Sequence, residues 1–479
     1  MGQLYVAVDF GSTFTKAVAV DAASGALVAR AESRTTIGTD VMDGWLACRT
    51  ALLEADQAVA KADVLACSSA GGGLRIAVVG NEELVTAEAG RRVALSSGGR
   101  VVAVVSGGLT ATSLKALRAD RPDVVLLLGG TDGGNSAVIE QAAAVLAKYR
   151  WRRPVVAAGN VESQGLIAST LGDADVPYVL ADNVVPEIGL FAPDSARAAI
   201  REMFLAHVIG GKNLSKDPGF ARLVRAATPD VVLRGVEVLA GLHGDVAVVD
   251  VGGATTDVHS VIELDPEDAN LGREVVATHP VTRTVEGDLG MRWSAVPVVA
   301  AGIESGLVAD DPLLREAAER RHADPSYLPD SADEATYDER LATIAITVAL
   351  RRHAGRQRVV FGPSGRVIER SGKDLREVDL LVGSGGVLRH NGPDVAARIL
   401  GAVGTGALEE GWLVPTAART TVDTDYVLAG VGLLAEVDLV AATGLARGIA
   451  GCHRHAVGSS HRWRRCDEQP GEAGGSGTR

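Results

Sequence analysis

Two copies of one short pattern limit the fold of this chain more than any other feature. The segment Asp9–Lys16 (DFGSTFTK) lies between two apolar runs, and Asp250–Asp257 (DVGGATTD) lies between two more. Each copy reads as a strand, an aspartate, a turn of small and hydroxyl-bearing residues, and a second strand. The copies are about 240 residues apart. We therefore predict two duplicated lobes that face one ligand.

The first turn has the residue types that phosphate binding requires. Small residues at the tip of a hairpin let backbone N–H groups approach phosphate oxygens closely. The hydroxyls of Ser12 and Thr13 can donate hydrogen bonds, and Lys16 can offset negative charge. Asp9, at the end of its strand, can hold hydrated Mg²⁺ or orient a water molecule. The alternative for one copy alone is an ordinary β-hairpin with a polar turn, but the second copy favours the phosphate site.

A third glycine-rich turn follows the apolar run 378–382 and precedes an expected helix. Its residues are Gly383, Ser384, Gly385 and Gly386. Bare backbone at such a place can support the adenosine of a nucleotide, although an isolated turn of this kind is often only a tight turn.

In this order, the three turns resemble the phosphate-1, phosphate-2 and adenosine motifs of the actin, Hsp70 and sugar kinase superfamily. This resemblance implies an α/β fold with two ribonuclease H-like lobes that bind ATP and Mg²⁺. Asp9 and Asp250 would be the carboxylates that face the metal and the water, and helices near 198–207 and 427–435 would connect the lobes. The residues implied to border the phosphates are Gly11, Ser12, Thr13, Lys16, Gly252, Gly253 and Thr255, and those implied to border the adenosine are Gly383, Gly385 and Gly386.

Within that superfamily the chain resembles the MutL family that is linked to glutamate mutase and is unrelated to the mismatch-repair protein. The strings that carry this resemblance are Asp9–Lys16, 39–42 (TDVM), 127–135 (LLGGTDGGN) and Asp250–Asp257. Members are regarded as ATPases that reactivate an adenosylcobalamin-dependent mutase. The resemblance thus implies a slow ATPase that acts as a chaperone, with such a mutase as its partner. A small-molecule kinase and a nucleotide-switched assembly protein are the alternatives on the same fold.

The order of strands and helices suggests further divisions of the chain. Three βα units begin at about residues 124, 155 and 178, which is the spacing of a parallel sheet inserted into the first lobe. The loop over 307–339 is acidic and is expected to be exposed. We expect a first lobe over 1–99, an inserted α/β module over 100–192, a connector over 193–235, a second lobe over 236–425, a C-terminal connector helix over 426–450 and a disordered tail over 451–479.

The composition excludes some classes of function. A net charge of −13 argues against a nucleic-acid partner, which would need a basic face. No apolar stretch is long enough to span a membrane, no signal peptide is recognisable, and four dispersed cysteines do not indicate a disulfide framework, so a cytoplasmic protein is expected. Cys452, His453, His455, His461 and Cys466 are spaced too irregularly to predict a zinc site.

Two local features remain open at this stage. The turn Gly129–Asn135 could bind an anion at the N-terminus of the following helix, or it could be a sharp βα turn capped by Asn135 or Ser136. Glu187 could point into a cleft, but an exposed loop carboxylate is the preferred interpretation.

Overall fold

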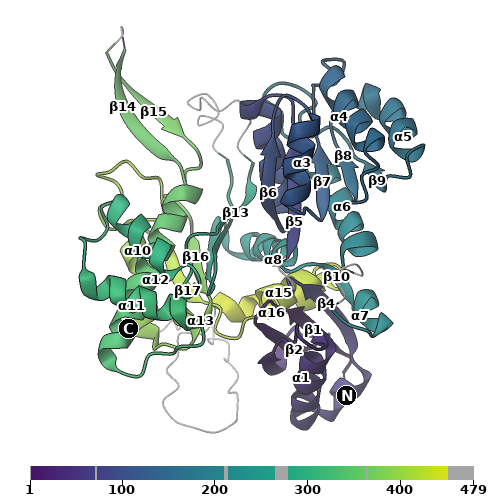
Figure 1. Ribbon diagram of the computed structural model, residues 1–479. Helices are drawn as coiled ribbons and strands as arrows, with labels where there is room; N and C mark the ends of the chain where they lie inside the picture. The colour runs from purple at the N-terminus through teal and green to yellow at the C-terminus, as the bar shows by residue number, and fades with distance from the viewer. Residues whose placement is uncertain (1, 71–72, 210–213, 265–278, 363–364, 451–479) are drawn as a thin grey trace, which may run out of the picture.

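The computed structural model describes residues 2–70, 73–209, 214–264, 279–362 and 365–450. Figure 1 shows three bodies: a first lobe in purple, a module in blue above it, and a second lobe in green on the opposite side. Two central helices, α8 (Thr228–His243) and α15 (Leu428–Leu434), lie between them.

The first lobe is built on a five-stranded sheet in the order β3-β2-β1-β4-β10. β1 pairs antiparallel with β2 and β2 with β3, whereas β4 and β10 run parallel to β1. Helix α1 packs on β2 and β3, and Trp45, Cys48 and Leu52 are buried beneath it. The elements are β1 (Leu4–Phe10), β2 (Phe14–Asp21), β3 (Leu27–Arg34), α1 (Val41–Ala55), η1 (Gln57–Lys61), β4 (Asp63–Ser68), α7 (Pro218–Leu223) and β10 (Val224–Ala227).

The second lobe repeats this topology. Its sheet has the order β13-β12-β11-β16-β17, with the first three strands antiparallel and the last two parallel to β11. The repeat confirms the expected pair of ribonuclease H-like lobes. The elements are β11 (Val246–Val251), β12 (Thr256–Val261), β13 (Val281–Glu286), α10 (Ala295–Glu304), α11 (Pro312–Ala323), α12 (Ala332–His353), β16 (Leu380–Ser384), α13 (Gly386–Arg389), α14 (Pro393–Gly401), η6 (Ala402–Gly404) and β17 (Arg419–Val422).

The module has its own parallel sheet in the order β6-β5-β7-β8-β9. Its buried residues, such as Leu114, Leu127 and Leu146, form a separate core on one face of that sheet. The elements are β5 (Leu74–Val79), η2 (Glu83–Ala87), α2 (Glu88–Ser96), β6 (Gly99–Val105), α3 (Ala111–Ala119), β7 (Val124–Leu127), α4 (Ala137–Lys148), β8 (Val155–Ala157), η3 (Val161–Ser163), α5 (Gln164–Gly172), β9 (Tyr178–Leu180), α6 (Asp194–Met203) and η4 (Phe204–Val208).

The expected start of this module at residue 100 is too late, because its sheet begins at Leu74. β4 and β5 are similar apolar runs in the sequence, and only their long-range partners decide the sheet to which each belongs. β4 pairs with β1, whereas β5 pairs with β6 and β7.

The first connector helix also differs from the expectation. The segment expected near 198–207 falls in α6 and η4, and α6 packs against β8 and β9 of the module. The connector is instead α8, which follows β10 of the first lobe and leads into β11 of the second. The C-terminal connector is not one helix, because α15 ends at Leu434 and α16 (Leu439–Ala450) follows it.

Helices α8 and α15 cross at very short range. An added Cβ atom at Gly235 would overlap the carbonyl oxygen of Leu428, and one at Gly432 would overlap that of Val231. Glycine at these two positions is therefore what lets the two backbones touch.

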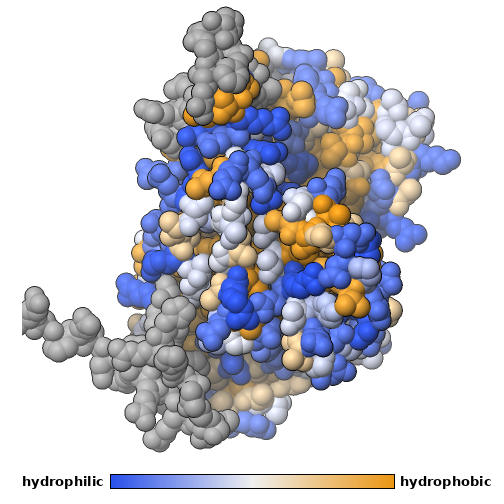
Figure 2. Space-filling model, turned by 90° about the vertical axis from the view of Figure 1, so that its left-hand side faces the viewer, coloured by the Kyte–Doolittle hydropathy of each residue, from blue (hydrophilic) through white to orange (hydrophobic). Residues whose placement is uncertain are grey.

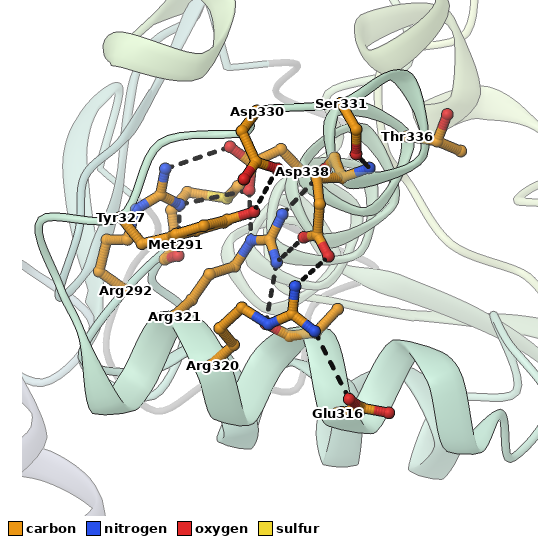
Figure 3. Close-up of polar contacts among 12 residues, drawn as sticks. Met291, Arg292, Glu316, Arg320, Arg321, Tyr327, Asp330, Ser331, Thr336 and Asp338 are labelled. Atoms are coloured by element: carbon orange, nitrogen blue, oxygen red, sulfur yellow. Dashed lines mark hydrogen bonds and ion pairs between the residues drawn. The ribbon is translucent and has the colours of Figure 1, made fainter.

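The acidic segment 307–339 is not an exposed loop. It contains α11 and the start of α12, and the side chain of Arg321 between them is fully buried. Arg321 donates hydrogen bonds to Glu334 at 2.9 Å and to Asp338 at 2.5 Å (Figure 3). Pairing with an arginine is what allows these carboxylates to leave water.

The remaining structure is peripheral. The hairpin β14 (Arg356–Gly362) and β15 (Gly365–Ser371) projects away from the second lobe. The face of that lobe shown in Figure 2 is largely hydrophilic, with apolar residues in separate patches. Within the described ranges, no helix combines the length and the apolar character needed to cross a bilayer. The expected tail over 451–479, with its cysteines and histidines, lies outside the described residues.

Candidate functional site

The two aspartate-containing turns have the same hydrogen-bond geometry. The N–H of Gly11 donates to the carbonyl of Phe14 at 3.1 Å, and the N–H of Gly252 donates to that of Thr255 at 2.9 Å. A side chain at Gly11 would meet the Phe14 carbonyl oxygen at 2.5 Å, so the turn requires glycine. The hydroxyl residues Ser12 and Thr13 are exposed at the tip of the first hairpin.

Asp9 lies at the base of the first hairpin, where β1, β2 and β4 meet. Its carboxylate is buried and accepts a 2.5 Å hydrogen bond from the hydroxyl of Thr228, the first residue of α8. The thiol of Cys67 on β4 lies 3.5 Å from the same oxygen. Burial raises the pKa of Asp9, and the positive charge of Lys16 and the bond from Thr228 oppose this rise. The start of the connector helix is thus tied directly to the first aspartate.

Asp250 occupies the equivalent place in the second lobe. It lies on β11 opposite Asp257 on β12 and beside Ser384 on β16. Loss of water contact raises the pKa of Asp250 to about 6, against the attraction of Lys16 and the hydrogen bond of Ser384. Ser384, the second residue of the third glycine-rich turn, therefore lies beside this carboxylate.

Tyr426 closes the space between the two aspartates. The ammonium nitrogen of Lys16 lies 3.1 Å from the centroid of the Tyr426 ring, and the Arg389 guanidinium lies 5.2 Å from it. Burial raises the pKa of the Tyr426 hydroxyl, and the negative charges of Asp250 and Asp9 raise it further. A cavity of about 10 Å³ remains beside Asp9, which is room for one water and not for a nucleotide.

The loop over 287–294, after β13, holds the backbone of the second turn in place. The N–H groups of Met291 and Arg292 donate to the carbonyls of Gly252 and Gly253 at 3.0 and 2.8 Å. The guanidinium of Arg292 is held in turn by Asp338, as Figure 3 shows. The buried ion-pair network of α11 and α12 therefore fixes the backbone of the second turn.

Asp257 links the second turn to the module. Its carboxylate accepts two hydrogen bonds from Arg283 on β13, at 3.0 and 2.5 Å. The same guanidinium donates to the carbonyls of Leu95 and Gly99, at the end of α2 and the start of β6. One buried arginine thus joins the strand after the second turn to the inserted module.

The glycines of the third turn have different roles. Gly385 has φ +104°, and a Cβ atom there would overlap the carbonyl oxygen of Val251. A Cβ atom at Gly383 would meet the Leu388 side chain at 2.6 Å. These two glycines let β16 and α13 pack against neighbouring backbone and side chains. Gly386 is exposed and has almost open space around it, so its backbone is the most accessible of the three.

The structure thus gathers Asp9, Lys16 and Asp250 into one cluster, since the charge of Lys16 acts on both carboxylates. Sequence reasoning missed Tyr426, Thr228 and the loop over 287–294. For the loop, a usable signal existed in the two glycines of the string EGDLGMR, between a strand and a helix. Tyr426 and Thr228 carry no comparable local pattern.

Both open features of the module now have an answer. The side chain of Asn135 accepts a hydrogen bond from the N–H of Ala137 at 2.9 Å, at the start of α4. Asp132 in the same turn accepts from the side chain of Asn183 at 2.8 Å. These contacts are those of a capped βα turn. Glu187 is exposed on its loop.

Comparison with known proteins decides the family. The model of the family described as MutL protein matches residues 5–448. Protein MutL of Clostridium tetanomorphum is 35% identical over 445 residues, which cover 90% of this chain and 96% of that protein. The chain belongs to the MutL family. The expected resemblance is thereby confirmed, and the three turns described above are those of a MutL protein.

Solved structures resemble this MutL family member only distantly. A nucleotide-free acetone carboxylase aligns with a TM-score of 0.40 and 15% identity, covering 91% of this chain and 70% of that one. The activator of 2-hydroxyisocaproyl-CoA dehydratase from Clostridium difficile, with bound ADPNP, aligns with a TM-score of 0.29 and 10% identity, covering 95% and 100%. The ROK hexokinase of Thermus thermophilus gives 0.28 and 10%, covering 90% and 97%.

Proposed function

We propose that this protein binds Mg·ATP between its two lobes and uses slow hydrolysis to reactivate an adenosylcobalamin-dependent mutase. The observation that carries the proposal is the pair of equivalent turns whose aspartates, Asp9 and Asp250, both lie near Lys16. Duplicated turns of this geometry suit a ligand with several phosphates, because each turn can offer N–H and hydroxyl groups to one end of the chain of phosphates.

In this account each turn has a defined task. The exposed residues Ser12 and Thr13 and the half-buried Thr255 bind phosphate oxygens, and Lys16 neutralises their charge. The carboxylates of Asp9 and Asp250 hold hydrated Mg²⁺, which commonly takes one or two carboxylates together with phosphate oxygens. The residues present fit this ion, because both side chains supply carboxylate oxygens and the positive charge of Lys16 acts on both. The metal would stabilise negative charge on the phosphates during hydrolysis.

Nucleotide binding is coupled to movement of the lobes through Tyr426. Lys16 cannot bind phosphate fully while its ammonium lies on the Tyr426 ring. Because Tyr426 closely precedes α15, displacement of the ring would act on the crossing of α15 with α8. ATP and ADP would then favour different arrangements, since only ATP has the third phosphate to contact both turns.

The client enzyme would bind the inserted module. Arg283 joins Asp257 of the second lobe to the carbonyls of Leu95 and Gly99, so a change at the second turn has a direct path to the module. An adenosylcobalamin-dependent mutase, glutamate mutase or a relative, is the client that the family suggests. Opening of that enzyme would let a damaged cofactor leave and an intact one enter.

A reactivation assay tests this function. Stalled mutase is mixed with this protein, ATP, Mg²⁺ and fresh adenosylcobalamin, and mutase turnover is followed. Recovery should require every component and should be lost with Asp9→Ala. Recovery without ATP would contradict the proposal, as would rapid phosphorylation of a sugar or organic acid in a metabolite screen. Failure with glutamate mutase alone, where another adenosylcobalamin mutase recovers, would reject that client only.

A further inference from the structure

A cavity lined by arginines lies on the inserted module. The cavity, of about 670 Å³, is lined by Arg75 of β5, Arg121 before β7, and Arg152 and Arg153 before β8. It lies at the amino ends of the module's strands. His207 of η4 completes the wall, and η4 belongs to the segment that returns the chain from the module to the first lobe.

The charge of this cavity is opposite to that of the whole chain. The chain has a net charge of −13, yet four arginines line the cavity and Asp123 is the only carboxylate among its lining residues. The guanidinium of Arg75 donates to the carbonyls of Asp120 at 2.7 Å and Arg121 at 3.2 Å. These uncharged partners fix the position of the Arg75 guanidinium and do not cancel its positive charge.

The other three arginines are available to a ligand. Among the residues that the structure describes, the side chains of Arg121, Arg152 and Arg153 make no hydrogen bond or ion pair, and they are exposed to the cavity. Other arginines of the module are paired: Arg91 with Glu88, and Arg201 with Asp230. Three unpaired arginines of the module therefore line one cavity.

The backbone at Arg121 is left-handed, as it also is at Arg150 after α4 and at Asp175 after α5. Arg121 follows α3 and has φ +45°, a left-handed conformation that this position after a helix usually gives to glycine. A residue with a side chain is strained in this region. Glycine would remove the strain, but it would also remove a guanidinium from the cavity.

We propose that this cavity binds a small anion that carries two or three linked phosphate groups, such as the polyphosphate part of a nucleotide. One guanidinium group can donate two parallel hydrogen bonds to two oxygens of a phosphate. Several converging arginines therefore favour a ligand with several phosphates. The volume lies within the range of small-molecule sites, roughly 300–1,000 Å³. Because the wall includes Arg75 of β5, the loops before β7 and β8, and His207 of η4, the bound anion would hold η4, which leads back to the first lobe, against the module's sheet.

Calorimetry with inorganic triphosphate and pyrophosphate in EDTA, at fixed ionic strength, tests this site. The protein carries Asp250→Asn throughout, so that the cleft is impaired. We expect saturable binding of triphosphate that falls at least tenfold in the double variant R152Q/R153Q. The matched control R49Q/R222Q removes two exposed arginines elsewhere and should change the affinity less than twofold. Equal losses in both double variants, or no binding of either phosphate, would overturn the proposal.

A further arm separates possible sources of the anion. ATP in EDTA that binds more tightly than triphosphate shows that the base is also recognised, whereas equal affinities assign the site to the phosphates alone, and both results support the site. Binding of a polyglutamate peptide in place of either phosphate would overturn it. Arg121→Gly should raise the melting temperature and weaken triphosphate binding several-fold. A variant with both a higher melting temperature and a higher affinity for triphosphate would contradict a role for Arg121 in the cavity.

Discussion

The ammonium nitrogen of Lys16 lies 3.1 Å from the centroid of the Tyr426 ring, on the line where the two lobes meet. Lys16 comes from β2 of the first lobe, and Tyr426 from the loop that leads from β17 of the second lobe to α15. The Tyr426 ring therefore competes with the phosphates of a nucleotide for the Lys16 ammonium group. The first prediction follows from this competition.

Replacing Tyr426 by alanine should tighten Mg·ATP binding, because the ligand no longer has to displace the ring from Lys16. A cation–π contact is worth about 0.5–2 kcal/mol, so the expected gain in affinity is roughly 2- to 30-fold. Tyr426→Phe keeps the ring and should change the dissociation constant less than about threefold. Calorimetric titration measures both. Weaker binding in the alanine variant than in the phenylalanine variant would mean that the ring contacts the nucleotide.

The crossing of α8 and α15 should be intolerant of a single methyl group. Gly432→Ala places its Cβ atom on the carbonyl oxygen of Val231, so we expect a loss of about 1–3 kcal/mol in the free energy of unfolding. Gly241→Ala lies in α8 with nothing within 4 Å and should stabilise by about 0.5–1 kcal/mol. Urea denaturation of the two variants gives the comparison. A stabilising Gly432→Ala would show that the helices do not cross at this range.

The ion-pair network under the second turn should matter for both stability and binding. Asp338→Asn leaves the fully buried Arg321 with less compensation and loosens the hold on Arg292, so we expect a loss of about 3 kcal/mol in unfolding free energy and weaker Mg·ATP binding. The exposed pair Arg315–Asp310 is the control: Arg315→Gln should cost less than about 1 kcal/mol. Equal losses in the two variants would exclude a special role for the buried network.

Lys373 should make the stability of the second lobe depend on pH. Burial lowers the pKa of this lysine from 10.5 to about 7 in the folded protein. Between pH 7 and pH 10.5 the unfolded chain therefore binds one more proton at this group, and stability rises with pH by about 1.4 kcal/mol per pH unit. Below pH 7 both states are protonated, and the contribution stays constant.

Comparison with Lys373→Met isolates this effect. The difference in unfolding free energy between the native protein and the variant, measured in urea at pH 7.5, 8.5 and 9.5, should shift in favour of the native lysine as the pH rises. Lys115→Met, which replaces an exposed lysine of α3, is the matched control and should show a much smaller trend. A pH-independent difference for Lys373→Met would show that Lys373 keeps an ordinary pKa.

The sequence predicts those parts of the site that are built from consecutive residues. The turns at Asp9 and Asp250 could be recognised because the strand, the carboxylate and the glycine follow one another along the chain. Tyr426 could not, because its partner Lys16 lies about 410 residues away in the sequence. Nothing in the residues around Tyr426 indicates that its ring contacts an ammonium group.

The same reason explains the errors in the fold. The predicted start of the module at residue 100 is too late, because the sheet to which β5 belongs depends on its pairing with β6 and β7. The segment 198–207 resembles a connector in the sequence because it is helical and precedes the second lobe. The decisive contact, the glycine at position 235 of α8 against Leu428 of α15, joins residues about 190 positions apart.

Titration of Mg·ATP into the native protein and into Asp250→Asn tests the central claim most directly. The account predicts saturable, Mg²⁺-dependent binding to the native protein and a loss of at least tenfold in affinity for Asp250→Asn, because the carboxylate that holds the hydrated metal is gone. Asp333→Asn, an exposed aspartate of α12, should bind as the native protein does. Undiminished binding to Asp250→Asn would contradict the placement of the nucleotide between the two turns.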